Sequence, residues 1–262
     1  MSNPYQSPGG FDVPPVKFTP YTISRAQVSY SEAINFAFSS PNWLVNCLLI
    51  GLVHFIPFVG SFIGPMLALG YLYGDYEGLI RDGRPVPSDF NLGKFMDYLQ
   101  RGVMAFLAML LASIAAAVGM VICLAPIMLL GALLAKESEE LAAVLMLLGY
   151  FLAFFLQFAF SIFIGPVVFR VGLSGKFEEL FNFRWAMSFV KMMWPQMILG
   201  CIVAALVGAL AGIVGLIACC VGLIPAVGYV NYLNFHIQRQ WYEVFVTKGG
   251  EPIPLTYEPF GK

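Results

Sequence analysis

Charged residues are scarce in this sequence, and four long stretches have none. Only 11% of the 262 residues are Asp, Glu, Lys or Arg, whereas soluble domains hold roughly 25%. The mean hydropathy is +0.79. Residues 33–74, 102–135, 141–169 and 192–238 contain no charge. This composition excludes an ordinary soluble domain, and the net charge of -1 gives no general attraction to nucleic acid.

The charge-free stretches predict about six membrane crossings. An α-helix needs about 20 apolar residues to cross about 30 Å of hydrocarbon. The first and last stretches are long enough for two crossings each, and the middle two for one each. The expected fold is an all-α polytopic membrane helical bundle with about six transmembrane helices. The 43–80 hairpin is expected to cross fully, although its short first arm leaves a re-entrant hairpin as the alternative.

The basic residues predict the orientation of the chain. If six helices cross the membrane, thirteen of the fourteen Lys and Arg residues lie on one side and Lys136 lies alone on the other. Cytoplasmic segments carry an excess of Lys and Arg. We therefore expect both termini to be cytoplasmic.

Three segments of the chain are related, which predicts a repeated unit. Residues 90–101 align with 181–192 at an offset of 91, and each has an apolar stripe at helical spacing. In the first copy Arg101 falls on the opposite, polar face. A weaker third copy begins at Ser29, with Glu32 at the spacing of a capping box. We expect three parallel units, each an interfacial amphipathic helix followed by a helical hairpin. The units are residues 23–86, 87–170 and 171–245, between a disordered Pro-rich cytoplasmic tail, 1–22, and a cytoplasmic C-terminal tail, 246–262.

Small and aromatic residues predict how the spans pack. A face of small residues recurs every four positions in the fifth span and allows close helix contact. It comprises Gly200, Ala204, Gly208 and Gly212. We expect the third and fifth spans to form a close-packed core, and the Phe-rich fourth span to face lipid. Gly119 or Pro126 is expected to kink or end the third span, whose charge-free stretch is too long for one straight crossing.

Motifs for catalysis and metal binding are absent from the sequence. There is no HExxH or GxSxG motif, and the five cysteines lack metal-ligand spacing, which makes them candidates for buried packing residues. His54, near the outer end of the first predicted span, is the one clear ionisable candidate within the spans, and we expect it to bond a backbone carbonyl. We therefore predict no catalytic, cofactor or metal site and do not expect an enzyme.

One polar cluster is a candidate site. The cytoplasmic ends of the second and sixth spans are repeat-related, and if they pack together their polar side chains would meet. The residues are Asp75, Glu77, Asn234, His236 and Arg239. The cluster would serve either as a docking or head-group site or as the ordinary polar end of an interfacial aromatic belt.

Several short motifs resemble the bacterial domain-of-unknown-function family 4013. They are Ser40-Pro41-Asn42-Trp43-Leu44, Ile56-Pro57-Phe58-Val59-Gly60, Leu69-Gly70-Tyr71, Arg81-Asp82-Gly83-Arg84-Pro85-Val86-Pro87, Phe181-Asn182-Phe183 and Gly222-Leu223-Ile224-Pro225. The resemblance covers about residues 30–245, and Asn182 stands where the family usually has an acidic residue. It implies a multi-span membrane protein of no established activity and no catalytic residues.

These observations favour a non-enzymatic scaffold or accessory subunit in the bacterial cytoplasmic membrane. The alternative is a permease, or a binder or handler of lipid or another apolar ligand. The expected partners are membrane lipids and either other membrane proteins or further copies of the chain, and not nucleic acid.

Overall fold

The described part of the chain is entirely helical, as the sequence predicts. The computed structural model describes residues 24–57, 60–82, 87–218 and 221–255. Its α-helices are α1 (Tyr30–Phe36), α2 (Trp43–His54), α3 (Gly60–Asp82), α4 (Phe95–Leu134), α5 (Glu139–Ser174), α6 (Phe183–Ile217) and α7 (Leu223–Thr247). Three short 3-10 helices accompany them: η1 (Ala37–Ser39), η2 (Leu92–Lys94) and η3 (Phe177–Phe181).

Polar side chains cap the helix starts. The Ser29 side chain accepts a hydrogen bond from the backbone N–H of Glu32, which confirms the predicted start of α1. Ser138 and Asn182 cap α5 and α6 in the same way. Gly175 ends α5 at a φ of 65°, a left-handed conformation that glycine adopts without steric cost.

Three helices are long and apolar enough to cross a membrane. They are α4, α5 and α6, with 40, 36 and 35 residues. A fourth candidate is the segment from α1 to α2, which bends by 94° between η1 and α2. Helices α3 and α7 are not candidate spans, because polar residues crowd their C-terminal halves. Six crossings therefore stay a prediction.

The amphipathic segments are not all separate helices. The first copy forms a separate helix, α1, because the chain turns at residues 40–42 before α2 begins. The second and third copies are the opening turns of α4 and α6. Helix α6 continues through Pro195, since a proline inside an apolar helix is tolerated where its neighbours satisfy the freed carbonyl. Likewise, neither Gly119 nor Pro126 ends α4.

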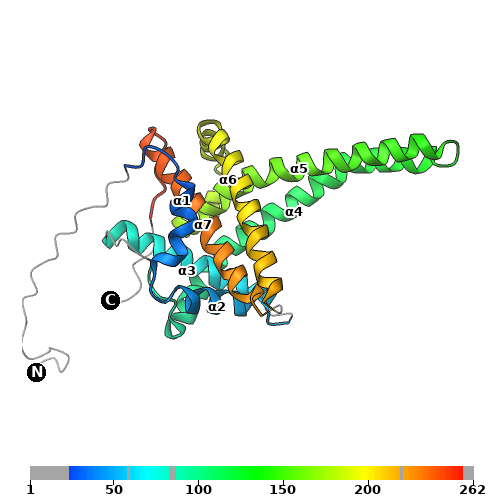
Figure 1. Cartoon of the computed structure of the whole chain (residues 1–262). Helices are drawn as coiled ribbons and strands as arrows, with labels where there is room; N and C mark the ends of the chain where they lie inside the picture. Colours follow the sequence, from blue (N-terminus) through cyan, green and yellow to red (C-terminus); the bar gives the residue numbers. More distant parts are fainter. Residues whose placement is uncertain (1–23, 58–59, 83–86, 219–220, 256–262) are drawn as a thin grey trace, which may run out of the picture.

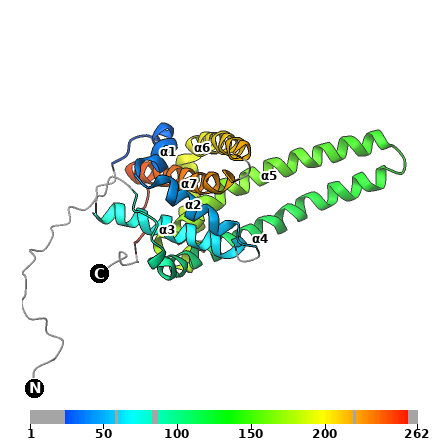
Figure 2. The same ribbon diagram turned by 60° about the horizontal axis from the view of Figure 1, so that its bottom comes forward.

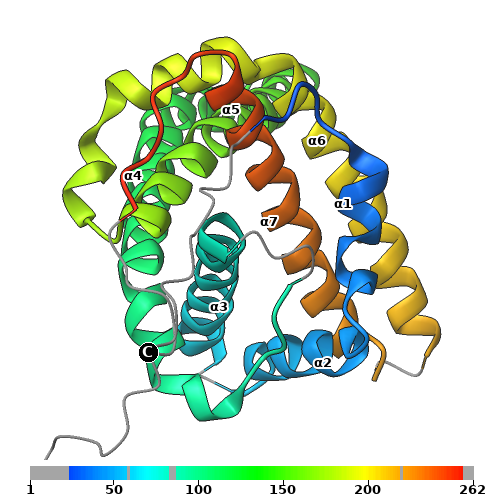
Figure 3. The same ribbon diagram turned by 90° about the vertical axis from the view of Figure 1, so that its left-hand side faces the viewer.

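Helices α4 and α5 form a long hairpin that projects from the body of the molecule (Figures 1 and 2). Helices α6 and α7 run across the direction of this hairpin (Figures 1 and 3). Within the body α2 packs beside α7, and α3 packs against α4 (Figure 2). Helix α2, with 12 residues, is short and packs mainly on α7. The three parallel units stay a prediction.

The outer half of the hairpin is exposed on both helices. Phe151, Phe154 and Phe155 of α5 are 57–66% exposed, which confirms that they point outward. The expectation of a close-packed third span is wrong for the outer half of α4, where Ile122 is 68% exposed. Cys123 is exposed there too, so it is not the buried packing residue that was predicted. Only α5 packs along this half of α4, which leaves its other faces open.

Two helix crossings in the body depend on glycine. A Cβ atom on Gly70 of α3 would lie 1.8 Å from the carbonyl oxygen of Tyr98, and one on Gly102 of α4 would lie 1.8 Å from that of Met66. The α2–α7 crossing repeats this geometry, because a Cβ atom on Gly51 would lie 1.8 Å from the carbonyl oxygen of Ile224. Such close approach of two backbones leaves no room for a side chain.

We expect the Gly70→Ala variant to be destabilised, because its methyl group would clash with the backbone of α4. Overpacking of this kind costs about 1–3 kcal/mol. The measurement is the Tm of the full chain in detergent. Gly212→Ala is the matched control, since a Cβ there meets nothing within 4 Å. Equal Tm values for the two variants would contradict the crossing.

Candidate functional site

The ionisable side chains that the structure buries gather in the body, beside the root of the hairpin. We call this group the polar core. It comprises Asp75, Glu77, Arg101, Arg170, His236, Arg239 and Glu243, each at most 8% exposed. A buried charge is costly unless it is paired and hydrogen-bonded. The contacts of these residues therefore decide what the site can do.

Glu243 joins the N-terminal segment to α7. Its carboxylate accepts hydrogen bonds from Nε of Arg239 at 2.8 Å and from Nε of Arg25 at 2.7 Å. The other two guanidinium nitrogens of Arg25 donate to Glu32 at 2.8 Å. The hydrogen bonds to Glu32, and then those to Glu243, raise the pKa of Arg25, although burial alone would lower it. The arginine therefore stays charged and holds α1 against α7.

His236 lies in a second link between the same elements. Gln240 accepts a hydrogen bond from Ser29 N through Oε1 at 2.6 Å, which fixes its amide orientation. Its Nε2 then donates to Ser29 O at 3.0 Å and to Nδ1 of His236 at 2.9 Å. Because Nδ1 accepts, the ring proton of His236 is on Nε2, 3.8 Å from Glu32. The Phe36 ring packs on the imidazole at a centroid distance of 4.0 Å.

Glu77 and Arg101 join α3 to α4. They form an ion pair in which the side chains are 0% and 2% exposed. Arg101 also donates to the carbonyl oxygen of Tyr73 at 3.3 Å. The expected polar, surface-facing position of Arg101 is wrong. Its helix continues into the α3–α4 crossing, where the guanidinium is enclosed.

Arg170 ties the end of α5 to η3 and α6. Its Nε donates to Glu179 at 2.7 Å, and its guanidinium lies 4.8 Å from the ring centroid of Trp185. Burial alone would raise the pKa of Glu179, but hydrogen bonds from Arg170 and Asn182 lower it. The Trp185 indole N–H donates to the carbonyl oxygen of Glu251 at 2.8 Å. The C-terminal segment is thereby fixed to the same cluster.

Another carboxylate, that of Asp89, organises the loop between α3 and α4. Asp89 accepts hydrogen bonds from Asn42, Asn46 and Ser40 at 2.7, 3.1 and 3.1 Å. The bonds from Asn42 and then Asn46 lower the pKa of Asp89. Asn46 also accepts from Phe90 N at 3.0 Å. The start of α2 is therefore anchored to this loop.

The structure places four of the five predicted cluster residues in the polar core. Asn234 is the exception, since it is exposed on α7. Helices α3 and α7 do meet, and the ring centroid of Tyr76 on α3 lies 5.0 Å from the guanidinium of Arg239. Asp75 accepts hydrogen bonds from the backbone N–H and hydroxyl of Ser88, both at 2.7 Å.

Sequence reasoning missed several members of the polar core. Arg101, Arg170 and Glu243 of the polar core were not among the predicted site residues, and neither was Arg25, which pairs with Glu243. One signal was present, because Arg239 and Glu243 are four residues apart on one helix face. The partners of Arg25 and Arg170 are distant in sequence or lie beyond a turn, so spacing does not identify them.

The predicted small-residue face on α6 packs on α7 over part of its length. A Cβ on Gly200 would lie 2.4 Å from the Trp241 ring, so the two helices approach closely there. Ala204 is partly buried against the core. A Cβ on Gly208 would lie 3.7 Å from Val230 of α7, an ordinary contact distance, and a Cβ on Gly212 would meet nothing within 4 Å.

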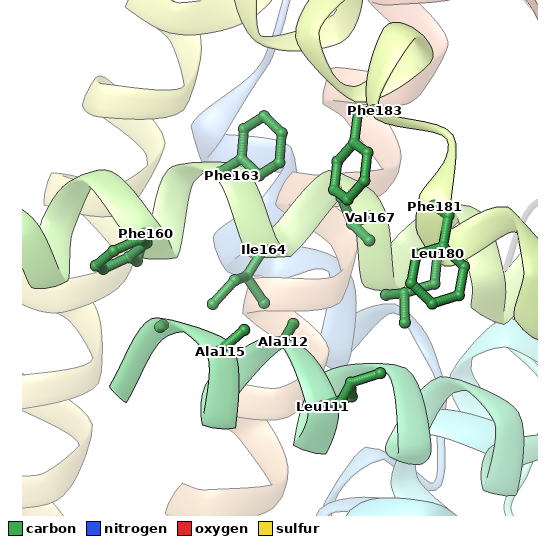
Figure 4. A pocket seen from close by; sticks show the side chains of 11 residues that line it. Leu111, Ala112, Ala115, Phe160, Phe163, Ile164, Val167, Leu180, Phe181 and Phe183 are labelled. Atoms are coloured by element: carbon green, nitrogen blue, oxygen red, sulfur yellow. The ribbon is translucent and has the colours of Figure 1, made fainter. Parts of the chain in front are cut away.

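An apolar pocket lies at the root of the hairpin, between α4, α5 and the start of α6 (Figure 4). Its volume is about 240 Å³. The eleven lining residues are all apolar: Leu111, Ala112, Ala115, Ala116, Phe160, Phe163, Ile164, Val167, Leu180, Phe181 and Phe183. A polar ligand would find no hydrogen-bonding side chain in this lining.

Candidate metal ligands are not clustered in the part of the chain that the structure describes, where no group of three His, Cys, Asp or Glu residues could hold an ion. His54 donates a hydrogen bond through Nδ1 to the carbonyl oxygen of Ile50 at 2.8 Å, the contact predicted for it. Since that atom belongs to the preceding turn of α2, the bond is local.

These features define an all-α protein whose longest apolar helices are candidate transmembrane spans. The chain belongs to the family described as "Protein of unknown function (DUF4013)", which matches residues 48–221. The match confirms the resemblance drawn from the short motifs, over a narrower range than expected. No curated protein and no solved structure matches the chain.

We expect Glu243→Gln to lower the free energy of unfolding by about 3 kcal/mol, the scale of breaking a buried ion pair. The neutral amide would leave Arg239 and Arg25 without their shared counter-charge. Chemical unfolding in detergent measures the loss. Glu178→Gln, at an exposed position of η3, should stay within about 0.5 kcal/mol of the natural chain. An equally small change at Glu243 would argue against this role.

Proposed function

We propose that this chain is an integral protein of the bacterial cytoplasmic membrane that acts without catalysis, as a scaffold or accessory subunit of a membrane complex. The observation that supports it most is how the polar core is used. Its charged groups link helices to one another and to the terminal segments. The long outer surfaces of α4, α5 and α6 are apolar.

The bonding of the buried acids favours a structural role over catalysis. A general base or nucleophile needs a position from which it can reach a substrate. Glu243 is held by two arginines, Glu77 by Arg101, and Asp75 by Ser88. The contacts of Arg25 with Glu243, of Glu77 with Arg101 and of Asp75 with Ser88 each join two separate segments, and Arg239 supports Glu243 from the same helix. Proton exchange by such an acid would weaken the body itself.

The topology belongs to the proposal: six crossings, with both termini in the cytoplasm. The distribution of Lys and Arg supports it. A helix of 40 residues is about 60 Å long, twice the thickness of the hydrocarbon. Because the α4–α5 hairpin and α6 run across each other, one bilayer holds both only if each is tilted. Their lengths allow such tilt.

A second candidate function is the handling of lipid or another apolar ligand. The apolar pocket at the root of the hairpin favours it, because dry cavities of about 150 Å³ already bind small apolar molecules. The pocket is larger than that, at about 240 Å³.

Native mass spectrometry of the tagged full chain, extracted in mild detergent, tests the scaffold proposal. We expect a defined mass above the 28.8 kDa of the chain, from a stoichiometric protein partner or a further copy. A tagged, unrelated membrane protein of similar size controls for adhesion to the tag. A monomer that carries lipid alone would contradict the scaffold and favour the second candidate.

Impermeant thiol labelling of intact cells tests the topology. In a chain freed of its five cysteines, Lys136→Cys should react from outside, whereas Glu178→Cys should react only after permeabilisation. Ser61→Cys should also react from outside if the first hairpin crosses fully, and not if it is re-entrant. Labelling of both the 136 and 178 positions from the same side would overturn the arrangement.

A further inference from the structure

We propose that the apolar pocket holds one acyl chain of an anionic phospholipid, whose head group binds the basic side chains of the adjacent face of α6. This inference rests on the membrane insertion in the proposed function and adds a defined ligand to it. The pocket is apolar throughout and opens where the apolar hairpin leaves the polar body (Figure 4). Its position fits the depth at which acyl chains meet head groups.

The position of the pocket follows from its neighbours in the chain. Val167 lines it and is buried, and Arg170, one turn further along α5, belongs to the polar core. In the other direction α5 continues into the exposed, Phe-rich half of the hairpin. Phe181 and Phe183, which line the pocket from η3 and α6, are 59% and 58% exposed. The pocket therefore borders both the apolar hairpin and the surface of the body.

The head-group side is a second hollow on the first turns of α6. Its lining residues are Arg184, Met187, Ser188, Lys191 and Met192, and its volume is about 520 Å³. Phe183 lines the apolar pocket and Arg184, the next residue, lines this hollow, so the two sites adjoin. Two exposed cations beside an apolar slot match a ligand with one negative head and a hydrocarbon chain. A basic residue near an anionic lipid surface attracts it, and Met187 and Trp194 on the same exposed face suit the interface.

The test uses the full chain in nanodiscs that contain a trace of photoreactive phosphatidylglycerol or phosphatidylcholine, each with a diazirine in the acyl chain. Crosslinked peptides are mapped by mass spectrometry. We expect phosphatidylglycerol to label residues 111–116 and 160–167 about thirtyfold more than phosphatidylcholine does, as two basic contacts would give. The outer segment 121–133 should show no such preference.

Two pairs of variants test the two halves of the site. Arg184→Gln with Lys191→Gln should abolish the preference for phosphatidylglycerol, while Lys136→Gln with Lys248→Gln removes the same charge elsewhere and should preserve it. Ala112→Phe should fill the pocket and remove labelling of 160–167 by both lipids, while Ala132→Phe, on the outer half of α4, should not. The charge pair decides the matter if Ala112→Phe fails to fold, because its residues are exposed.

Equal labelling by the two lipids, or labelling spread evenly over α4, would overturn the site and leave only bulk lipid around the hairpin. Copurification of a protein segment that crosslinks to residues 111–116 in place of lipid would overturn it too. Either result leaves the scaffold proposal standing, since that depends on the mass of the complex. A monomer with a lipid-filled pocket would have the opposite meaning, since it would support the lipid site and contradict the scaffold proposal.

Discussion

The pairing of buried charges is the constraint on which the body of this protein depends. Its helices are apolar enough to associate in many ways, and apolar packing alone does not select one of them. Glu243 can satisfy its charge only where Arg25 and Arg239 both reach it. Glu77 likewise needs Arg101 across the α3–α4 crossing. Because an unpaired charge at these positions is costly, the pairs favour one register of the helices over the others.

The polar core and the hairpin differ in the kind of side chain they contain and in whether those side chains are buried or exposed. In the core, buried arginines, carboxylates and tyrosines bond to one another. In the outer half of the hairpin, leucine and phenylalanine side chains face outward with no protein covering them. The apolar pocket lies where these two environments meet. A ligand there would need both a hydrocarbon part and a polar part, which is the chemistry of a membrane lipid.

The sequence predicts the helical class and the long apolar helices, because charge-free stretches have few other stable structures. It also predicts the α1 cap, since that depends on residues three apart. It misplaced Arg101, whose environment is set by a glycine crossing with another helix rather than by its own helix face. The direction of the hairpin relative to α6 depends on contacts between distant segments. Local periodicity contains no information about them.

The packing of α2 against α7 has a consequence for biosynthesis. Helix α2 leaves the ribosome among the first elements, but its glycine, Gly51, fits against a backbone that is translated near the end. Glu243, which pairs with Arg25, is also translated near the end. The early part of the chain must therefore remain incompletely assembled until α7 has been made. A product truncated before α7 could not close the body.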